Sequence, residues 1–82
     1  MTPDAMLALI REEVARILAE KGEGPAEVGA DTRFLGGDLP FDSLDLATLV
    51  VALEGRTGRD PFRAGFRQFT TAGELAGLYA AA

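Results

Sequence analysis

An apolar repeat in the middle of the chain limits most strongly what it can fold into. Four residues recur at i, i+3, i+4 and i+7: Leu46, Leu49, Val50 and Leu53. This spacing places all four on one face of a helix. Asp42 precedes the repeat as a candidate N-cap, and Asp45 follows three residues later to complete an imperfect capping box. The pattern predicts a helix that begins at Asp42 or Ser43 and frays near residues 55–58.

Ser43 presents a hydroxyl group at the start of this predicted helix, beside a loop. Unpaired backbone N–H groups and the helix dipole favour a negatively charged phosphodiester at such a position. The chain contains neither histidine nor cysteine, which excludes Ser-His-Asp and Cys-His catalytic groups and the usual zinc sites. Asp42 and Asp45 are weak bases near neutral pH. We therefore interpret Ser43 as the attachment point of a phosphate-linked prosthetic group that another enzyme adds.

Two further segments precede this helix. Thr2 followed by Pro3 is typical of an N-cap with proline at the first helical position. We expect a first helix from Pro3 to Lys21, with Gly22 as its stop. Residues 22–41 contain too much glycine and proline for a regular element. They are predicted to form a long loop between the first two helices, fastened to the core by four apolar side chains: Val28, Phe34, Leu35 and Leu39.

Two more segments follow it. Asp60 and Pro61 repeat the pattern of N-cap and first-turn proline, which predicts a short third helix over residues 61–67. Residues 71–74 read Thr-Ala-Gly-Glu, a capping box that predicts a last helix from Ala72 nearly to the C-terminus. Three aromatic residues in and after the short helix share a helical spacing and are interpreted as core: Phe62, Phe66 and Phe69.

The chain shows no convincing alternation of apolar and polar residues that would indicate a strand, and no internal repeat. We expect a single all-α domain over residues 1–82, a four-helix bundle of three main helices and the short third one. The net charge of −5 disfavours nucleic acid as a partner. The sequence has neither a run of about 18 apolar residues nor a signal-peptide pattern, so we expect a cytoplasmic protein that does not bind membranes.

Three stretches resemble acyl carrier proteins: the long loop with Phe34 and Leu39, Asp42-Ser43-Leu44-Asp45, and Phe69-Thr70-Thr71. Asp42, Ser43 and Leu44 match the end of that family's Gly-x-Asp-Ser-Leu motif, whereas Pro40 stands where the motif has glycine. The resemblance implies that Ser43 receives 4′-phosphopantetheine from coenzyme A through a separate, Mg²⁺-dependent transferase. The thiol of this arm would then carry an acyl group as a thioester. The protein would be a monomeric carrier rather than an enzyme, served by a phosphopantetheinyl transferase and by acyl-loading and acyl-transferring enzymes.

The resemblance also implies that the second helix is the main docking element and that the acyl chain can slip between helices. The candidate cavity walls, for which a plain core role is the alternative, are Leu46, Leu49, Leu53, Phe66, Phe69 and Leu75. The candidate docking residues are Phe41, Asp45, Thr48, Glu54, Arg56 and Arg63. Asp42 and Leu44 are candidate cofactor-binding residues beside Ser43, and Leu44 is also expected to point outward as the centre of a small partner contact. Thr48 and Arg56 occupy positions that are often acidic in the family, so this docking face is expected to carry less negative charge.

A basic series accompanies the end of the second helix: Arg56, Arg59, Arg63 and Arg67. It is either a solvated surface or a docking surface for dedicated enzymes whose charge pattern differs from that of general fatty-acid synthesis. The leading interpretation is an acyl carrier of a specialised fatty-acid, polyketide or related pathway. The alternatives are an aminoacyl or peptidyl carrier and an unmodified interaction module of the same fold. An enzyme that holds a metal ion through Asp38, Asp42 and Asp45 is disfavoured, and no metal is expected.

Overall fold

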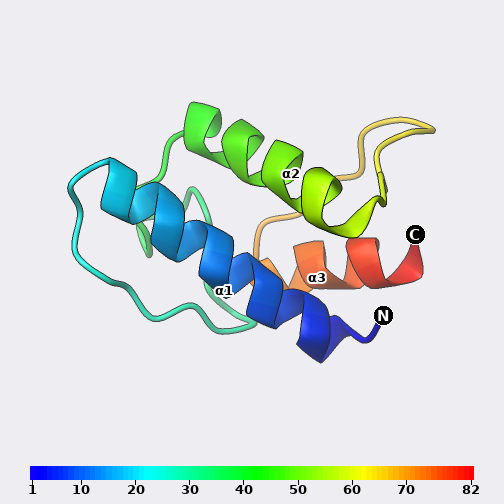
Figure 1. The fold of residues 1–82 in the computed structure, drawn as a ribbon, viewed down its shortest axis with the longest axis horizontal. Helices are drawn as coiled ribbons and strands as arrows, with labels where there is room; N and C mark the ends of the chain where they lie inside the picture. Colours follow the sequence, from blue (N-terminus) through cyan, green and yellow to red (C-terminus); the bar gives the residue numbers. More distant parts are fainter.

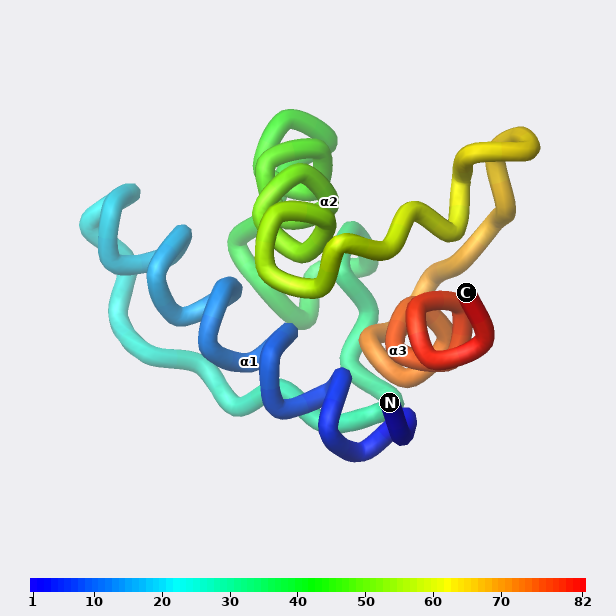
Figure 2. Tube along the Cα trace, turned by 45° about the vertical axis from the view of Figure 1, so that its right-hand side comes forward, coloured from blue at the N-terminus to red at the C-terminus, as the bar shows by residue number.

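The computed structural model describes residues 1–82 and contains three helices and no strand. The helices are α1 (Pro3–Glu20), α2 (Ser43–Thr57) and α3 (Ala72–Ala81). In Figure 1, α1 and α2 lie side by side and run in opposite directions, and α3 lies beside the first half of α1. Figures 1 and 2 both place the two chain ends close to each other. The expected all-α fold is confirmed.

Local capping signals set the limits of the helices. The Thr2 hydroxyl accepts a backbone hydrogen bond of 3.1 Å from the first turn of α1, and this helix ends at Glu20, one residue before the expected end. Thr71 and Glu74 form the predicted capping box of α3. Gly58 ends α2 in the left-handed conformation with φ of 68°, which glycine adopts at little cost. None of the three helices is both long enough and apolar enough to cross a bilayer.

The short helix expected over residues 61–67 is not formed, so the fold has three helices rather than four. Two tight turns replace it. The N–H of Arg63 donates to the carbonyl oxygen of Asp60 at 3.3 Å, and the N–H of Gly65 donates to the carbonyl oxygen of Phe62 at 3.1 Å. Gly65 has a φ of 140°, far from helical values, and a single turn without further i to i+4 bonds is too short to propagate.

The core gathers the apolar faces of all three helices. Three of the four predicted loop anchors, Val28, Phe34 and Leu39, are buried within it. Leu35 is 54% exposed, so the prediction that it anchors the loop is wrong. Its neighbour Phe34 takes the inward position, where it is 1% exposed and its N–H donates to the carbonyl oxygen of Thr70. The largest fully buried side chains are Tyr79, Phe34, Met6, Ile10, Leu18, Leu49, Leu53, Leu75 and Val14.

The long connection between α1 and α2 is fastened to the start of α3. The N–H of Phe34 donates to the carbonyl oxygen of Thr70 at 3.1 Å, and the N–H of Gly73 donates to that of Ala30 at 2.8 Å. Figure 2 shows this connection passing beside the first turn of α3. A Cβ atom at Gly73 would lie 2.8 Å from the Ala30 oxygen, so the approach requires glycine. A loop with no regular structure is thereby held in one place.

Three phenylalanines of the segment between α2 and α3 contact one another. Phe62 stacks on Phe66 with ring centroids 5.8 Å apart and lies 5.9 Å from Phe69. Phe62 also meets the edge of the buried Tyr79 at 6.3 Å. Phe66 is 79% exposed, so the prediction that it belongs to the core is wrong. Without a helix over residues 61–67, the three rings no longer share one inward face, and Phe66 is left at the outer end of the cluster.

Candidate functional site

Ser43 is the first residue of α2, is exposed to solvent, and is the only serine in the chain. The residues on either side of it form a reciprocal cap. A carboxylate oxygen of Asp42 accepts from the N–H of Asp45 at 2.9 Å, and a carboxylate oxygen of Asp45 accepts from the N–H of Asp42 at 3.0 Å. The N–H groups of Ser43 and Leu44, at the first two helical positions, have no intrahelical partner. The hydroxyl group therefore lies at the positive end of the helix dipole.

Lys21, just beyond the end of α1, holds the stretch before Ser43. Its ammonium group donates to Asp45 at 2.6 Å and to the carbonyl oxygen of Pro40, and lies 6.0 Å from the ring centroid of Phe41. The hydrogen bond from Lys21 holds the pKa of Asp45 below its usual range, and the same bond raises the pKa of Lys21. Phe41 is half-buried and stacks on Phe34 at 6.2 Å. Asp45 and Phe41, both predicted docking residues, are engaged within the chain.

The outward face of α2 is nearly uncharged. Leu44 is 74% exposed, as predicted, and Val51, seven residues later on the same face, is 70% exposed. Thr48 lies exposed between them, and its hydroxyl donates to the carbonyl oxygen of Leu44 at 3.1 Å. Glu54 is the one exposed acid on α2 beyond the capping residues. The sequence interpretation missed Val51, although its spacing from Leu44 carried the signal.

Arg56 makes an ion-pair bridge from α2 to α1. Its guanidinium group donates to Glu12 at 3.1 Å and to Glu13 at 3.0 Å, and Glu13 also receives a hydrogen bond from Arg16. Burial raises the pKa of the Glu13 carboxyl group, but the bonds from Arg16 and Arg56 outweigh this effect and hold the pKa below its usual range. Arg56 is thus committed to the fold, and its partners, more than forty positions earlier in the chain, were not predicted from the sequence.

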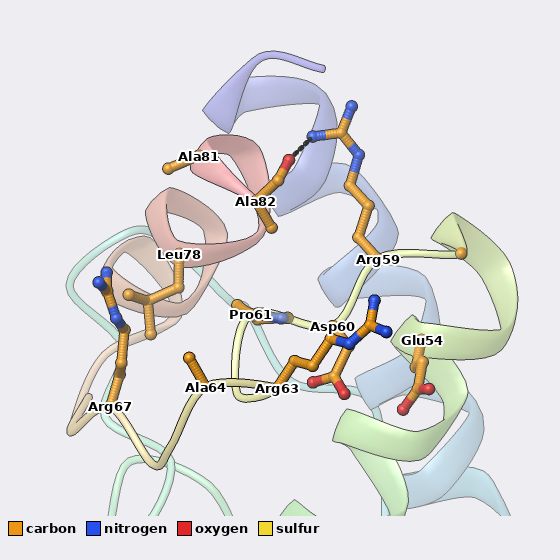
Figure 3. A pocket seen from close by; sticks show the side chains of 11 residues that line it. Glu54, Arg59, Asp60, Pro61, Arg63, Ala64, Arg67, Leu78, Ala81 and Ala82 are labelled. Atoms are coloured by element: carbon orange, nitrogen blue, oxygen red, sulfur yellow. Dashed lines mark hydrogen bonds between the residues drawn. The ribbon is translucent and has the colours of Figure 1, made fainter.

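The other three arginines of the basic series surround a pocket of about 640 Å³ between the ends of α2 and α3. Arg59 donates to the carbonyl oxygens of Tyr79 at 3.4 Å and Ala82 at 2.6 Å, which caps the end of α3 (Figure 3). Arg63 and Arg67 are exposed and take part in no ion pair or side-chain hydrogen bond of the structure. These two guanidinium groups are available to a partner.

The predicted cavity walls divide into three groups. Leu46 and Phe69 line a pocket of about 290 Å³, together with Phe34 and Leu35, and Leu46 lies one turn after Ser43 on α2. Phe66 lines neither this pocket nor the larger one. Three residues are fully buried core side chains outside the pocket: Leu49, Leu53 and Leu75.

The acidic residues near Ser43 do not gather as a metal site. Asp38 accepts from the guanidinium group of Arg33 at 3.0 Å, and this contact holds the pKa of Asp38 below its usual range. Asp42 and Asp45 are used by the reciprocal cap. No three acidic side chains of the chain come together in a metal-binding group. The structure therefore gives no support to a metal-dependent enzyme built on these residues.

Comparison with known proteins agrees with this geometry. The family described as “phosphopantetheine attachment site” matches residues 8–79. A search of curated proteins found no match. The solution structure of MacpD, an acyl carrier protein from Pseudomonas fluorescens involved in mupirocin biosynthesis, matches with a TM-score of 0.84 and 36% sequence identity, over 95% of this chain and 70% of that chain. This chain therefore belongs to the acyl carrier protein family, whose members carry a covalently attached 4′-phosphopantetheine group.

Proposed function

We propose that this protein carries acyl intermediates as thioesters on a 4′-phosphopantetheine arm attached to the hydroxyl oxygen of Ser43. The observation that carries the proposal is the position of the chain's only serine, exposed at the first residue of α2 within the matched family region. The protein is not itself the catalyst in this proposal. Separate enzymes attach the arm, load it and unload it, and the carrier acts as a monomer in the cytoplasm.

The residues around Ser43 fit the arm. The arm supplies a thiol for thioester formation, and this chain supplies the hydroxyl oxygen to which its phosphate is joined. The free N–H groups of Ser43 and Leu44 and the dipole of α2 favour the negative charge of that phosphodiester. Asp42 and Asp45 accept hydrogen bonds in the reciprocal cap, and carboxylates are weak bases near neutral pH, so neither is suited to activate the hydroxyl group. Deprotonation of Ser43 is therefore a task of the transferase.

The pocket beside Leu46 and Phe69 is the proposed resting place of the first carbons of the cargo. It lies one helical turn from Ser43, and its walls are largely apolar: Phe34, Leu35, Leu46 and Phe69. Burial of a methylene group stabilises by about 0.8 kcal/mol, which favours entry of an acyl chain over exposure to water. The related carrier MacpD is described as involved in mupirocin biosynthesis. Its similarity supports a specialised polyketide or related pathway for this chain.

Intact-mass measurement tests the attachment directly. The unmodified protein is incubated with coenzyme A, Mg²⁺ and a promiscuous phosphopantetheinyl transferase. The wild-type chain is expected to gain the mass of one phosphopantetheinyl group, and Ser43→Ala is expected to gain none. Thr48→Ala removes the exposed hydroxyl group of a candidate docking residue and leaves Ser43 in place. It is the matched control and should reach the same fully modified mass as the wild type at the end of the reaction.

Two outcomes would overturn the proposal. A wild-type chain that stays unmodified by a transferase active on another carrier would leave only an interaction module of this fold. Modification that persists in Ser43→Ala would move the attachment to another residue. The transferase assay does not distinguish an acyl cargo from an aminoacyl cargo, because the transferase adds the arm. The cargo is identified from the group that a loading enzyme joins to the free thiol.

A further inference from the structure

The basic side chains of this protein are divided between internal and available ones. Of the eight lysines and arginines, six donate hydrogen bonds to acceptors within the chain: Arg11, Arg16, Lys21, Arg33, Arg56 and Arg59. Arg63 and Arg67 make no such bond, and they stand three residues before and one residue after the exposed Phe66 in the sequence. We call these three residues the Arg63–Phe66–Arg67 patch. Its two guanidinium groups can form ion pairs with a partner molecule.

The patch is held in place by the aromatic cluster beneath it. Phe66 stacks on Phe62 at 5.8 Å and contacts Phe69 at 6.4 Å, so the ring is exposed and yet supported. In Figure 3, Arg63 extends on the side of Asp60 and Glu54, while Arg67 lies beside Leu78 of α3. The two guanidinium groups thus lie on opposite sides of one pocket. A partner protein that covers this pocket can place one carboxylate against each of them.

The patch continues the outward face of α2. Leu44, Val51 and Glu54 follow one another along this face at intervals of seven and three residues, and Glu54 lines the pocket that contains both arginines. The 15 residues of α2 span about 22 Å. A standard protein interface covers about 800 Å² on each partner, which is wide enough to reach from one end of α2 to the other. An enzyme that covers this face to reach Ser43 therefore also meets the patch.

We propose that the Arg63–Phe66–Arg67 patch selects the partner enzyme, and that its occupant is an acidic surface of an acyl-handling enzyme, with carboxylates for the arginines and an apolar contact for Phe66. The proposal rests on the proposed carrier function. Charge complementarity argues for it. Glu54 is the only exposed acid of α2 beyond the cap, and Asp60, which lines the same pocket, accepts the N–H of Phe62 at 3.0 Å. Arg63 and Arg67 are the charged side chains of this pocket that no side-chain hydrogen bond engages, apart from Glu54.

Other occupants fit less well. Nucleic acid requires many phosphate contacts, whereas this patch offers two guanidinium groups on a chain of net charge −5. An anionic lipid surface would repel the same net charge, and one exposed ring gives little apolar area for insertion. A protein surface of limited area, with a few carboxylates placed opposite the arginines, satisfies all three residues at once.

The double variant Arg63→Gln/Arg67→Gln tests the patch. The probe is an acyl-loading enzyme that intact-mass measurement shows to acylate the phosphopantetheine form of this carrier, and binding of the unmodified carrier to it is measured by titration calorimetry and stopped-flow. We expect the affinity to fall about tenfold, mainly through a slower association rate, and the salt dependence seen with the wild type to weaken. Charge reversal at both arginines, combined with lysine in place of the facing carboxylates of the enzyme, should restore binding.

The control is Ala8→Glu/Ala15→Glu, which lowers the net charge by the same two units on the exposed side of α1. It should bind like the wild type, and all variants should keep the helical circular dichroism and melting temperature. Equal binding by the arginine variant and the wild type at every salt concentration would overturn the proposal. Sedimentation of the wild type, but not of the arginine variant, with phosphatidylglycerol vesicles would assign the patch to lipid instead.

The two proposals fail in different ways. Attachment of the arm is read from intact mass at Ser43, and the arginine variant should be modified by a promiscuous transferase as fast as the wild type when assayed at saturating carrier. Binding of the loading enzyme is read from the unmodified chain. If the chain is not modified but its binding still depends on the patch, the proposed carrier function alone is wrong. If the chain is modified but its binding does not depend on the patch, the proposed role of the patch alone is wrong.

Discussion

Glu13 lies on the buried side of α1, where its carboxylate joins two helices. Its side chain is 7% exposed, against 62% for its neighbour Glu12, although both accept from Arg56. Glu13 lies next to Val14 and one turn from Leu9, Ile10 and Ile17, at the edge of the inward face of α1. Two arginines make its burial tolerable: Arg16, three residues later on α1, and Arg56, 43 residues away in the chain. Such distant pairs cannot be read from local sequence.

Glu13→Gln should destabilise the fold, whereas Glu12→Gln should matter little. Because Glu13 is buried, loss of its charged hydrogen bonds is expected to cost about 1.5–3 kcal/mol, against at most about 1 kcal/mol for the exposed Glu12. The folded pKa of Glu13 is lowered, so its stabilisation is present above the usual carboxyl range near pH 4 and is lost as pH falls through the folded pKa. Urea unfolding at pH 7 and pH 3 checks both predictions. A gap in unfolding free energy between Glu13→Gln and the wild type that is as large at pH 3 as at pH 7 would contradict the assignment.

At the scale of elements, local signals were sufficient for the three helices. The caps at Thr2, Asp42 and Thr71 each start a helix within one residue of the predicted position. The short helix failed because proline and an N-cap can start a turn but cannot propagate it against Gly65. The path of the loop was beyond prediction, since it depends on the contact between Ala30 and Gly73, which lie far apart in the sequence.

Two glycines of α3 should respond in opposite ways to alanine. Gly73→Ala places a Cβ atom 2.8 Å from the Ala30 oxygen and is expected to destabilise by about 1–3 kcal/mol. Gly77→Ala meets nothing within 4 Å and should stabilise the helix by about 0.5–1 kcal/mol. Chemical denaturation followed by circular dichroism measures both. Stabilisation by both substitutions would show that the loop yields at Ala30.

At the scale of the whole molecule, α2 is fixed at both ends and in the middle. Near the start of α2, Asp45 accepts from Lys21. In the middle, the carbonyl oxygen of Val50 accepts from the Tyr79 hydroxyl at 3.2 Å, and near the end of α2, Arg56 donates to Glu13 of α1. The position of Ser43 was predictable because a cap is a local feature. The ion pairs of Asp45 and Arg56, two predicted docking residues, were not predictable, because their partners Lys21, Glu12 and Glu13 are distant in sequence.

Stability of the whole fold should fall in alkaline solution through Tyr79. Burial, together with the charges of Asp60 and Glu54, raises the pKa of Tyr79 to about 12. The unfolded chain loses this proton near pH 10, so the stabilisation is complete below pH 10 and is lost as pH rises toward 12. Tyr79→Phe should cost about 1 kcal/mol at pH 7 and show a shallower fall between pH 10 and 12. Thermal unfolding across this range measures the difference; parallel curves for the two proteins would count against it.

On the proposed function, attachment of the arm to Ser43 depends on a separate enzyme. The carboxylates of Asp42 and Asp45 accept backbone N–H groups, and Asp45 also binds Lys21. Carboxylates are weak bases near neutral pH, so the Ser43 hydroxyl group has no neighbour suited to take its proton. On the proposed function, the unmodified chain therefore does not react with coenzyme A without the transferase. The rate at which the carrier gains its arm is then set by the amount of transferase. Until that enzyme is present, the carrier stays folded and unmodified.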